Sequence, residues 1–178
     1  MPTGLRPARV LDVITVRPAL PADFERIGDI TVAAYALPGD VDYVDFLRNT
    51  ADRAVPPTEI WVAELDGVVV GSVTWCPPGS IHREVAGPDD GEFRTLAVDP
   101  AAQGHGVGAA LFRAIVDRAR ADGLSGIALT TASWMTTAHG LYERAGFVRT
   151  PTLDWTAGDI VLLTYRLDLA PEWPTQPP

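Results

Sequence analysis

Hydrophobic and polar positions along the chain follow two periods, one typical of strands and one typical of helices. Short runs of apolar and β-branched residues that end at Gly, Pro or Asp predict strands. Longer segments with apolar residues three and four positions apart predict helices that pack one face on a sheet. The expected strands cover residues 13–17, 60–65, 68–75, 92–98, 127–131, 147–150 and 160–167, and the expected helices cover residues 21–35, 41–53, 106–121 and 133–145.

Local signals support these elements and their order. Asp66-Gly67 lies between two apolar runs and is typical of a two-residue type I′ hairpin turn. Ser133 is a candidate N-cap for the last helix. The order β-α-α-β-β-β-α-β-α-β-β predicts an α/β fold in one domain, residues 13–168. A flexible N-terminus (residues 1–12) and a proline-rich, disordered tail (residues 169–178) are expected on either side.

Composition narrows the classes of partner. The 178 residues suit one domain with a substantial core. A net charge of −9 argues against nucleic acid or an anionic membrane and favours cationic small molecules or peptides. The single cysteine, Cys76, excludes an internal disulfide, so we expect a cytoplasmic location. The three histidines, at positions 82, 105 and 139, lack the spacing of metal ligands, so no metal site is expected.

Residues 92–111 combine a strand, a glycine-rich turn and the start of a helix. Gly104, Gly106 and Gly108 separate the strand from the helix. Several glycines allow backbone N–H groups to converge on an anion, and a helix N-terminus adds free N–H groups and the positive end of its dipole. The pattern therefore predicts a site for a phosphate or pyrophosphate.

Three nucleotide-binding motifs compete for this loop. A P-loop is excluded because no Gly-Lys-Ser/Thr follows the glycines. The dinucleotide motif fits at Gly104, Gly106 and Ala109, but it needs a strand that leads directly into the first glycine. It also needs an acidic residue about 20 positions later, and neither is present. The remaining pattern is Gln103-x-x-Gly106-x-Gly108.

This last pattern resembles motif A of the GCN5-related N-acetyltransferase (GNAT) family, whose loop binds the pyrophosphate of acetyl-CoA. A second stretch is similar to the family signature A-x-x-L-Y-x-x-x-G-F, with Ala138, Leu141, Tyr142, Gly146 and Phe147 at the matching positions. The resemblance covers residues 13–168. It implies a mixed sheet that splays between its fourth and fifth strands, where the pantetheine arm of acetyl-CoA pairs with the fourth strand.

The resemblance also implies a set of residues for binding acetyl-CoA. They are main-chain groups of Leu96, Ala97 and Val98, the loop residues Gln103, Gly104, His105, Gly106, Val107, Gly108 and Ala109, and Ala138 on the following helix. Many relatives carry Asn at the position of Met135, and methionine cannot donate the same hydrogen bond.

Transfer of an acetyl group to an amine needs a base and an acid. An alkyl amine with a pKa of about 10.4 is almost fully protonated at pH 7, so a proton must be removed before attack. The resemblance assigns this base to Glu92, although a chain of waters, with Glu92 as a plain surface acid, stays open. It assigns protonation of the departing thiolate to Tyr142. A main-chain N–H near Leu96 or Ala97 is expected to stabilise the oxyanion.

We therefore expect an N-acetyltransferase that moves an acetyl group from acetyl-CoA to a primary amine of a small molecule or peptide. The alternative is a non-catalytic domain that binds acyl-CoA and regulates another activity. The resemblance places the acceptor pocket between the first two helices, the loop after the third strand and the C-terminal strands. Trp75, Trp134 and Trp155 are candidates to line it. The identity of the amine and a homodimeric assembly are left open.

Overall fold

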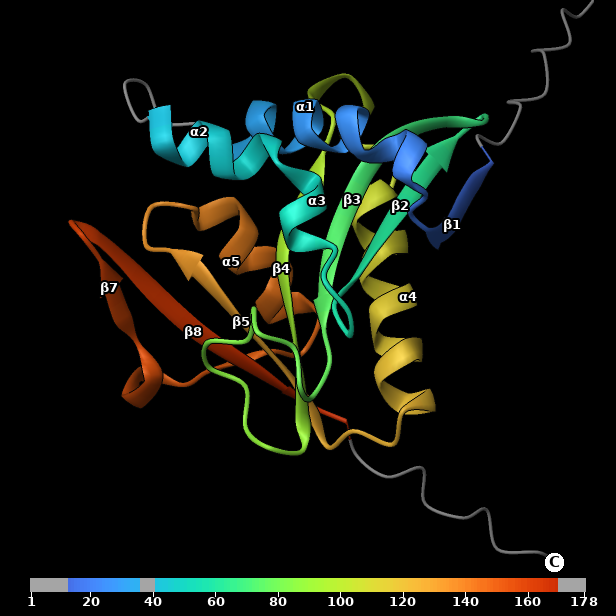
Figure 1. Cartoon of the computed structure of the whole chain (residues 1–178). Coiled ribbons are helices and arrows are strands. Elements are labelled where there is room, and N and C mark those ends of the chain that lie inside the picture. The colour runs from blue at the N-terminus through green and yellow to red at the C-terminus, as the bar shows by residue number, and fades with distance from the viewer. Residues whose placement is uncertain (1–12, 36–40, 170–178) are drawn as a thin grey trace, which may run out of the picture.

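The computed structural model describes residues 13–35 and 41–169, which form one eight-stranded mixed sheet with helices on both faces (Figure 1). The strands are β1 (Ile14–Pro18), β2 (Glu59–Leu65), β3 (Val68–Cys76), β4 (Asp90–Val98), β5 (Gly126–Ala132), β6 (Val148–Arg149), β7 (Trp155–Ala157) and β8 (Ile160–Asp168). The helices are α1 (Phe24–Tyr35), α2 (Val41–Arg48), α3 (Thr50–Arg53), α4 (Val107–Ala121) and α5 (Thr136–Arg144). Short 3-10 turns cover Pro21–Asp23, Pro100–Ala102 and Pro151–Leu153.

The sheet splits in the middle, as expected. Its order is β1-β2-β3-β4-β5-β8-β6, with β7 paired to β8. The parallel pairing of β4 with β5 is confined to residues 90–92 of β4, opposite residues 126–128 of β5. Beyond Glu92, β5 continues beside β8 as far as Ala132, while β4 stays with β3. The β5-facing edge of residues 93–98 is therefore left without a strand partner.

Helices α1 and α4 cover opposite faces of the sheet. Successive side chains of a strand point to opposite faces. On β2, Ile60 and Val62 pack in a cluster with Ile27 of α1, whereas Ala63 belongs to a second cluster with Leu111 of α4. The larger cluster continues into α5 and β8, so the core extends under both halves of the split sheet.

Most predicted elements are present, and the differences have local causes. The Asp66-Gly67 turn has positive φ at both residues, 51° and 81°, as a type I′ turn requires. The expected helix 41–53 breaks at Asn49, whose side chain accepts a hydrogen bond from the Asp52 N–H and caps α3. The Ser133 cap prediction is wrong, because α5 begins at Thr136. Strand β7 was not predicted.

The predicted flexible N-terminus and most of the proline-rich tail lie outside the described residues. Over residues 13–35 and 41–169, none of the helices combines the length and the apolar character needed to cross a lipid bilayer.

Candidate active site

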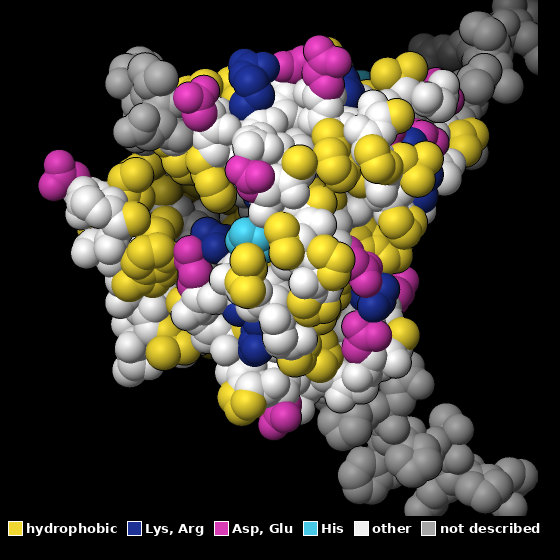
Figure 2. Space-filling model, viewed as in Figure 1, with side chains coloured by type: hydrophobic (Ala, Val, Ile, Leu, Met, Phe, Trp, Pro, Cys, Tyr) yellow, Lys and Arg dark blue, Asp and Glu magenta, His cyan; other side chains and the backbone are white. Residues whose placement is uncertain are grey.

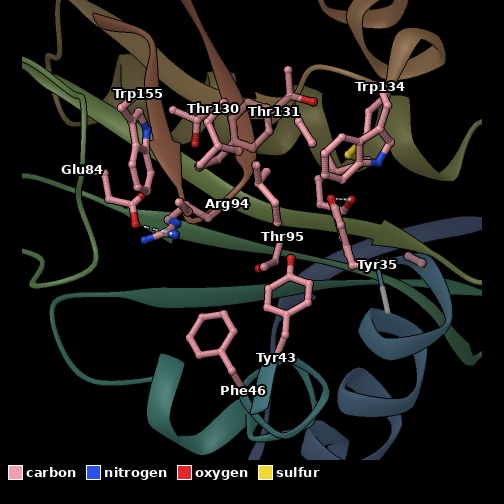
Figure 3. A pocket seen from close by; sticks show the side chains of 18 of the residues that line it. Tyr35, Tyr43, Phe46, Glu84, Arg94, Thr95, Thr130, Thr131, Trp134 and Trp155 are labelled. Atoms are coloured by element: carbon pink, nitrogen blue, oxygen red, sulfur yellow. Dashed lines mark hydrogen bonds and ion pairs between the residues drawn. The ribbon is translucent and has the colours of Figure 1, made fainter. Parts of the chain in front are cut away.

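A cavity of about 560 Å³ opens where β4 and β5 diverge. Its walls come from α1 and α2 on one side and from β5, α5, β7 and β8 on the other, with β4 between them (Figure 3). Figure 2 shows a hollow on this side of the molecule, bordered largely by hydrophobic side chains. A cavity is therefore present in the region where the acceptor pocket is predicted, between the first two helices, the loop after the third strand and the C-terminal strands.

A bulge in β4 lies beside this cavity. Ser72 pairs with Ala97 and Thr74 pairs with Arg94, so two residues of β4, Thr95 and Leu96, stand opposite one residue of β3. Thr95 adopts a φ of 46°, which is unusual for a β-branched residue. Four successive residues line the cavity, Phe93, Arg94, Thr95 and Leu96, whereas a regular strand would present alternate residues.

Two predicted site residues connect this cavity to a second one. A smaller cavity of about 210 Å³ is lined by residues of α4 and α5, including Ala109 and Leu141. Leu96 and Tyr142 line both cavities. A molecule that extends from the glycine loop past α4 and α5 would therefore meet a molecule in the larger cavity beside these two residues.

Tyr142 is held by a cluster of aromatic rings. It is 7% exposed, and its ring centroid lies 5.9 Å from those of Phe93 and Phe147 and 6.2 Å from that of Tyr165. Burial raises the pKa of Tyr142 to about 12. The hydroxyl therefore keeps its proton throughout the neutral range and can act as a proton donor.

The glycine loop forms an open cradle at the end of β4. Gly104 and Gly106 have φ values of +82° and +85°, and a Cβ at either position would meet no atom within 4 Å. Residues 103–106 are exposed, and α4 starts directly after Gly106. This space, with free N–H groups at the start of α4, fits a pyrophosphate group.

The other predicted cofactor residues differ in what their side chains do. Ala97 and Val107 are each 1% exposed and pack in the core, so only their main chains can contribute. The Leu96 carbonyl accepts a hydrogen bond of 2.5 Å from the Tyr35 hydroxyl, which takes one of its two acceptor sites. His105 Nδ1 lies 3.2 Å from the Ala102 carbonyl. The remaining predicted cofactor residues lie at the end of β4, at the glycine loop, on α4 or on α5 beside the core. They are Val98, Gln103, Gly108, Ala109 and Ala138.

The structure does not bring Glu92 to the cavity. Its side chain is fully buried, and Oε2 accepts hydrogen bonds from the backbone N–H groups of Glu84, Val85 and Ala86 at 2.9, 2.9 and 3.1 Å. A carboxylate enclosed in this way cannot contact an amine in the cavity. The geometry argues against the base role predicted for Glu92 and shows instead an anchor for the loop between β3 and β4.

That loop carries an acidic residue which the sequence reasoning missed. Glu84 lines the cavity, and its Oε1 forms a 2.8 Å ion pair with Arg94. Burial raises the pKa of Glu84, and the nearby Arg94 opposes part of this increase. Nothing in the surrounding polar sequence distinguishes Glu84 from its neighbours, because its position depends on the hydrogen bond between its backbone N–H and the buried Glu92 side chain.

The tryptophans predicted to line the acceptor pocket divide into two groups. Trp134 and Trp155 line the cavity together with Met135. Trp75 is fully buried in the core instead, against Gly91, where an added Cβ would lie 2.0 Å from the indole ring.

A mixed sheet split beside its fourth strand, with a glycine loop at the end of that strand, is the architecture of an acetyltransferase-type α/β domain. The model of the acetyltransferase (GNAT) family matches residues 25–147. The chain belongs to this family.

Several named relatives are similar to this chain. Mycothiol acetyltransferase from Cellulomonas flavigena is 34% identical over 143 residues, which are 77% of this chain and 41% of that protein. IAA acetyltransferase from Azospirillum brasilense is 36% identical over 101 residues, which are 57% of this chain and 61% of that protein. The chain thus spans about two fifths and three fifths of the lengths of these two relatives.

Solved structures share the fold over most of the chain. The Salmonella typhimurium protein yncA, solved with its cofactor acetyl-CoA, has a TM-score of 0.63 and 26% identity, covering 88% of this chain and 94% of its own. The ribosomal-protein-S18-alanine N-acetyltransferase from Escherichia coli has a TM-score of 0.69 and 17% identity, covering 93% and 99%.

Proposed function

We propose that this chain transfers an acetyl group from acetyl-CoA to a primary amine bound in the larger cavity. The observation that carries the proposal is the position of Leu96 and Tyr142, which line both the larger cavity and the smaller one between α4 and α5. Two substrates that enter from different sides can meet only at such a junction. The yncA structure with acetyl-CoA supports the same cosubstrate for this fold.

The residues present fit acetyl-CoA. The open space at Gly104 and Gly106 and the N-terminus of α4 would hold the pyrophosphate. The unpaired edge of β4 offers main-chain groups to the pantetheine arm, and Arg113 and Arg144, which line the smaller cavity, add positive charge beside it. When bound, acetyl-CoA supplies the activated acetyl group.

Two side chains of the cavity handle protons in this proposal. The Tyr142 hydroxyl holds a proton next to the junction and donates it to the departing sulfur. Glu84 is the only carboxylate among the described residues that line the cavity, and it takes the proton from the incoming amine directly or through one water. Its raised pKa makes it a better proton acceptor than a fully exposed glutamate.

Acetyl-CoA is expected to raise the melting temperature, because a ligand that binds only the folded state stabilises it. Gly106→Ala should weaken this effect and lower acetyl-CoA affinity by about tenfold or more, since the new methyl group occupies the cradle. Gly67→Ala is the matched control: Gly67 has a φ of +81° and equally open surroundings, but lies in the β2–β3 turn. Equal affinity in the two variants would contradict the cradle assignment.

The reaction itself is tested by release of free CoA thiol over a panel of primary amines. Release that depends on both acetyl-CoA and an amine is the expected result. Binding of acetyl-CoA without release for every amine class on the panel would support the regulatory alternative instead.

A further inference from the structure

The larger cavity is bounded by two aromatic walls that face each other across β4. Tyr43 and Phe46 of α2 form one wall, with ring centroids 6.3 Å apart and planes inclined by 15°. Trp134 and Trp155 belong to the opposite wall (Figure 3). Phe46 and Trp134 both line the cavity, and they are 43% and 51% exposed. Such walls favour a flat apolar group between them.

The aromatic wall on α2 is held in place by contacts between the end of α2 and the core. The buried Arg53 donates a hydrogen bond of 2.7 Å from Nη1 to the Leu47 carbonyl, at the end of α2. Leu47 itself is fully buried, so the residue next to Phe46 is fixed in the core. The wall is therefore present before any ligand binds.

The charge in the cavity does not select a highly charged acceptor. Glu84 and Arg94 are the only charged side chains among the described lining residues, and they pair with each other. Arg94 is also tied to the His82 carbonyl by a 2.8 Å hydrogen bond. The lining has a net charge of zero, so a polyamine would lose hydration without finding matching carboxylates.

We propose that the acceptor is an arylalkylamine. Its ring lies between the aromatic wall on α2 and the opposite wall, and its amine points to Leu96 and Tyr142 at the junction. This proposal rests on the proposed function, because it names the substrate class for the same reaction.

The first test compares acceptors in the thiol-release assay. Tyramine, tryptamine and 2-phenylethylamine should each show a kcat/KM about 100-fold or more above that of putrescine, which has no aromatic ring. Isothermal titration of the same amines into protein saturated with CoA measures binding without turnover. Preference for putrescine, for an amino acid or for a peptide N-terminus would overturn the substrate class and leave the acetyl-transfer function standing.

Two variants test the walls. Phe46→Ser and Trp134→Ser should each raise KM for tryptamine about tenfold, with little change in acetyl-CoA affinity. Val148→Ser serves as a control, because Val148 is 70% exposed and lies outside the cavity. An unchanged KM in both wall variants would overturn the aromatic slot. Absence of thiol release with every amine, together with absence of arylalkylamine binding, would overturn both this proposal and the proposed function.

Discussion

Replacing Tyr142 with Phe is expected to lower turnover by about 10²- to 10⁴-fold at pH 7, while acetyl-CoA still binds. The substitution removes only the hydroxyl, and the ring keeps its contacts with Phe93 and Phe147. Folding should therefore change by less than about 1.5 kcal/mol, the usual range for one hydrogen bond. The effect on the turnover rate should be larger than the effect on stability, because the departing sulfur no longer receives a proton from a residue at the junction of the two cavities.

The defect should become smaller as the pH rises. A thiol with a pKa of about 8.5 leaves readily as a thiolate above that pH, so it then needs less help from a proton donor. Burial holds the pKa of Tyr142 at about 12, and deprotonation of Tyr142 therefore does not contribute in this range. Rate measurements for both proteins between about pH 6.5 and 9.5 would reveal converging profiles.

Tyr165→Phe is a matched control for this experiment. Tyr165 belongs to the same aromatic cluster and is 2% exposed, but it lines neither cavity, and its hydroxyl donates to Glu143 Oε1 at 3.3 Å. It should keep parental turnover. Parental turnover in Tyr142→Phe would show that the acid role is wrong, and failure of that variant to fold would show that Tyr142 serves only the core.

The fold was predictable because its signals are local. The Asp66-Gly67 turn, the glycine loop and the helical spacing around Tyr142 each depend on residues within one or two turns of chain. The spacing of Ala138, Leu141 and Tyr142 places Tyr142 on the sheet-facing or site-facing side of its helix, and in the structure its ring lies against Phe93 of β4. The position of the split in the sheet followed from the family resemblance.

The details of the acceptor side depend on contacts between distant residues. The bulge at Thr95 has no sequence signal, since threonine normally favours a regular strand. An acidic residue at the start of a strand can face solvent or the interior with the same local pattern, and only the structure shows that Glu92 is enclosed by the loop at 84–86. The backbone N–H of Glu84 takes part in the same contact, and the Glu84 side chain lines the cavity.

The two glutamates lead to the second large expected effect. Glu84→Gln should lower turnover by about 10²-fold or more while stability stays near that of the parent, because Glu84 lines the cavity and is the proposed proton acceptor. A base works only when deprotonated, so activity falls as the pH decreases through its pKa. Since burial raises the pKa of Glu84, this loss should occur above the pKa of about 4.3 of an exposed glutamate. In Glu84→Gln the acidic limb should disappear from the pH profile.

Glu92→Gln provides the comparison, because the same change of charge at that position should act mainly on folding. Three N–H groups would bind a neutral amide oxygen in place of a carboxylate, and hydrogen bonds to charged groups are the stronger kind. We expect a loss of roughly 1–3 kcal/mol in urea unfolding. Turnover also decreases in this variant, since the loop that carries Glu84 is held less firmly, but the acidic limb should persist. If the limb disappears in Glu92→Gln and persists in Glu84→Gln, then Glu92 is the base, as the sequence first predicted, and the role proposed for Glu84 is wrong.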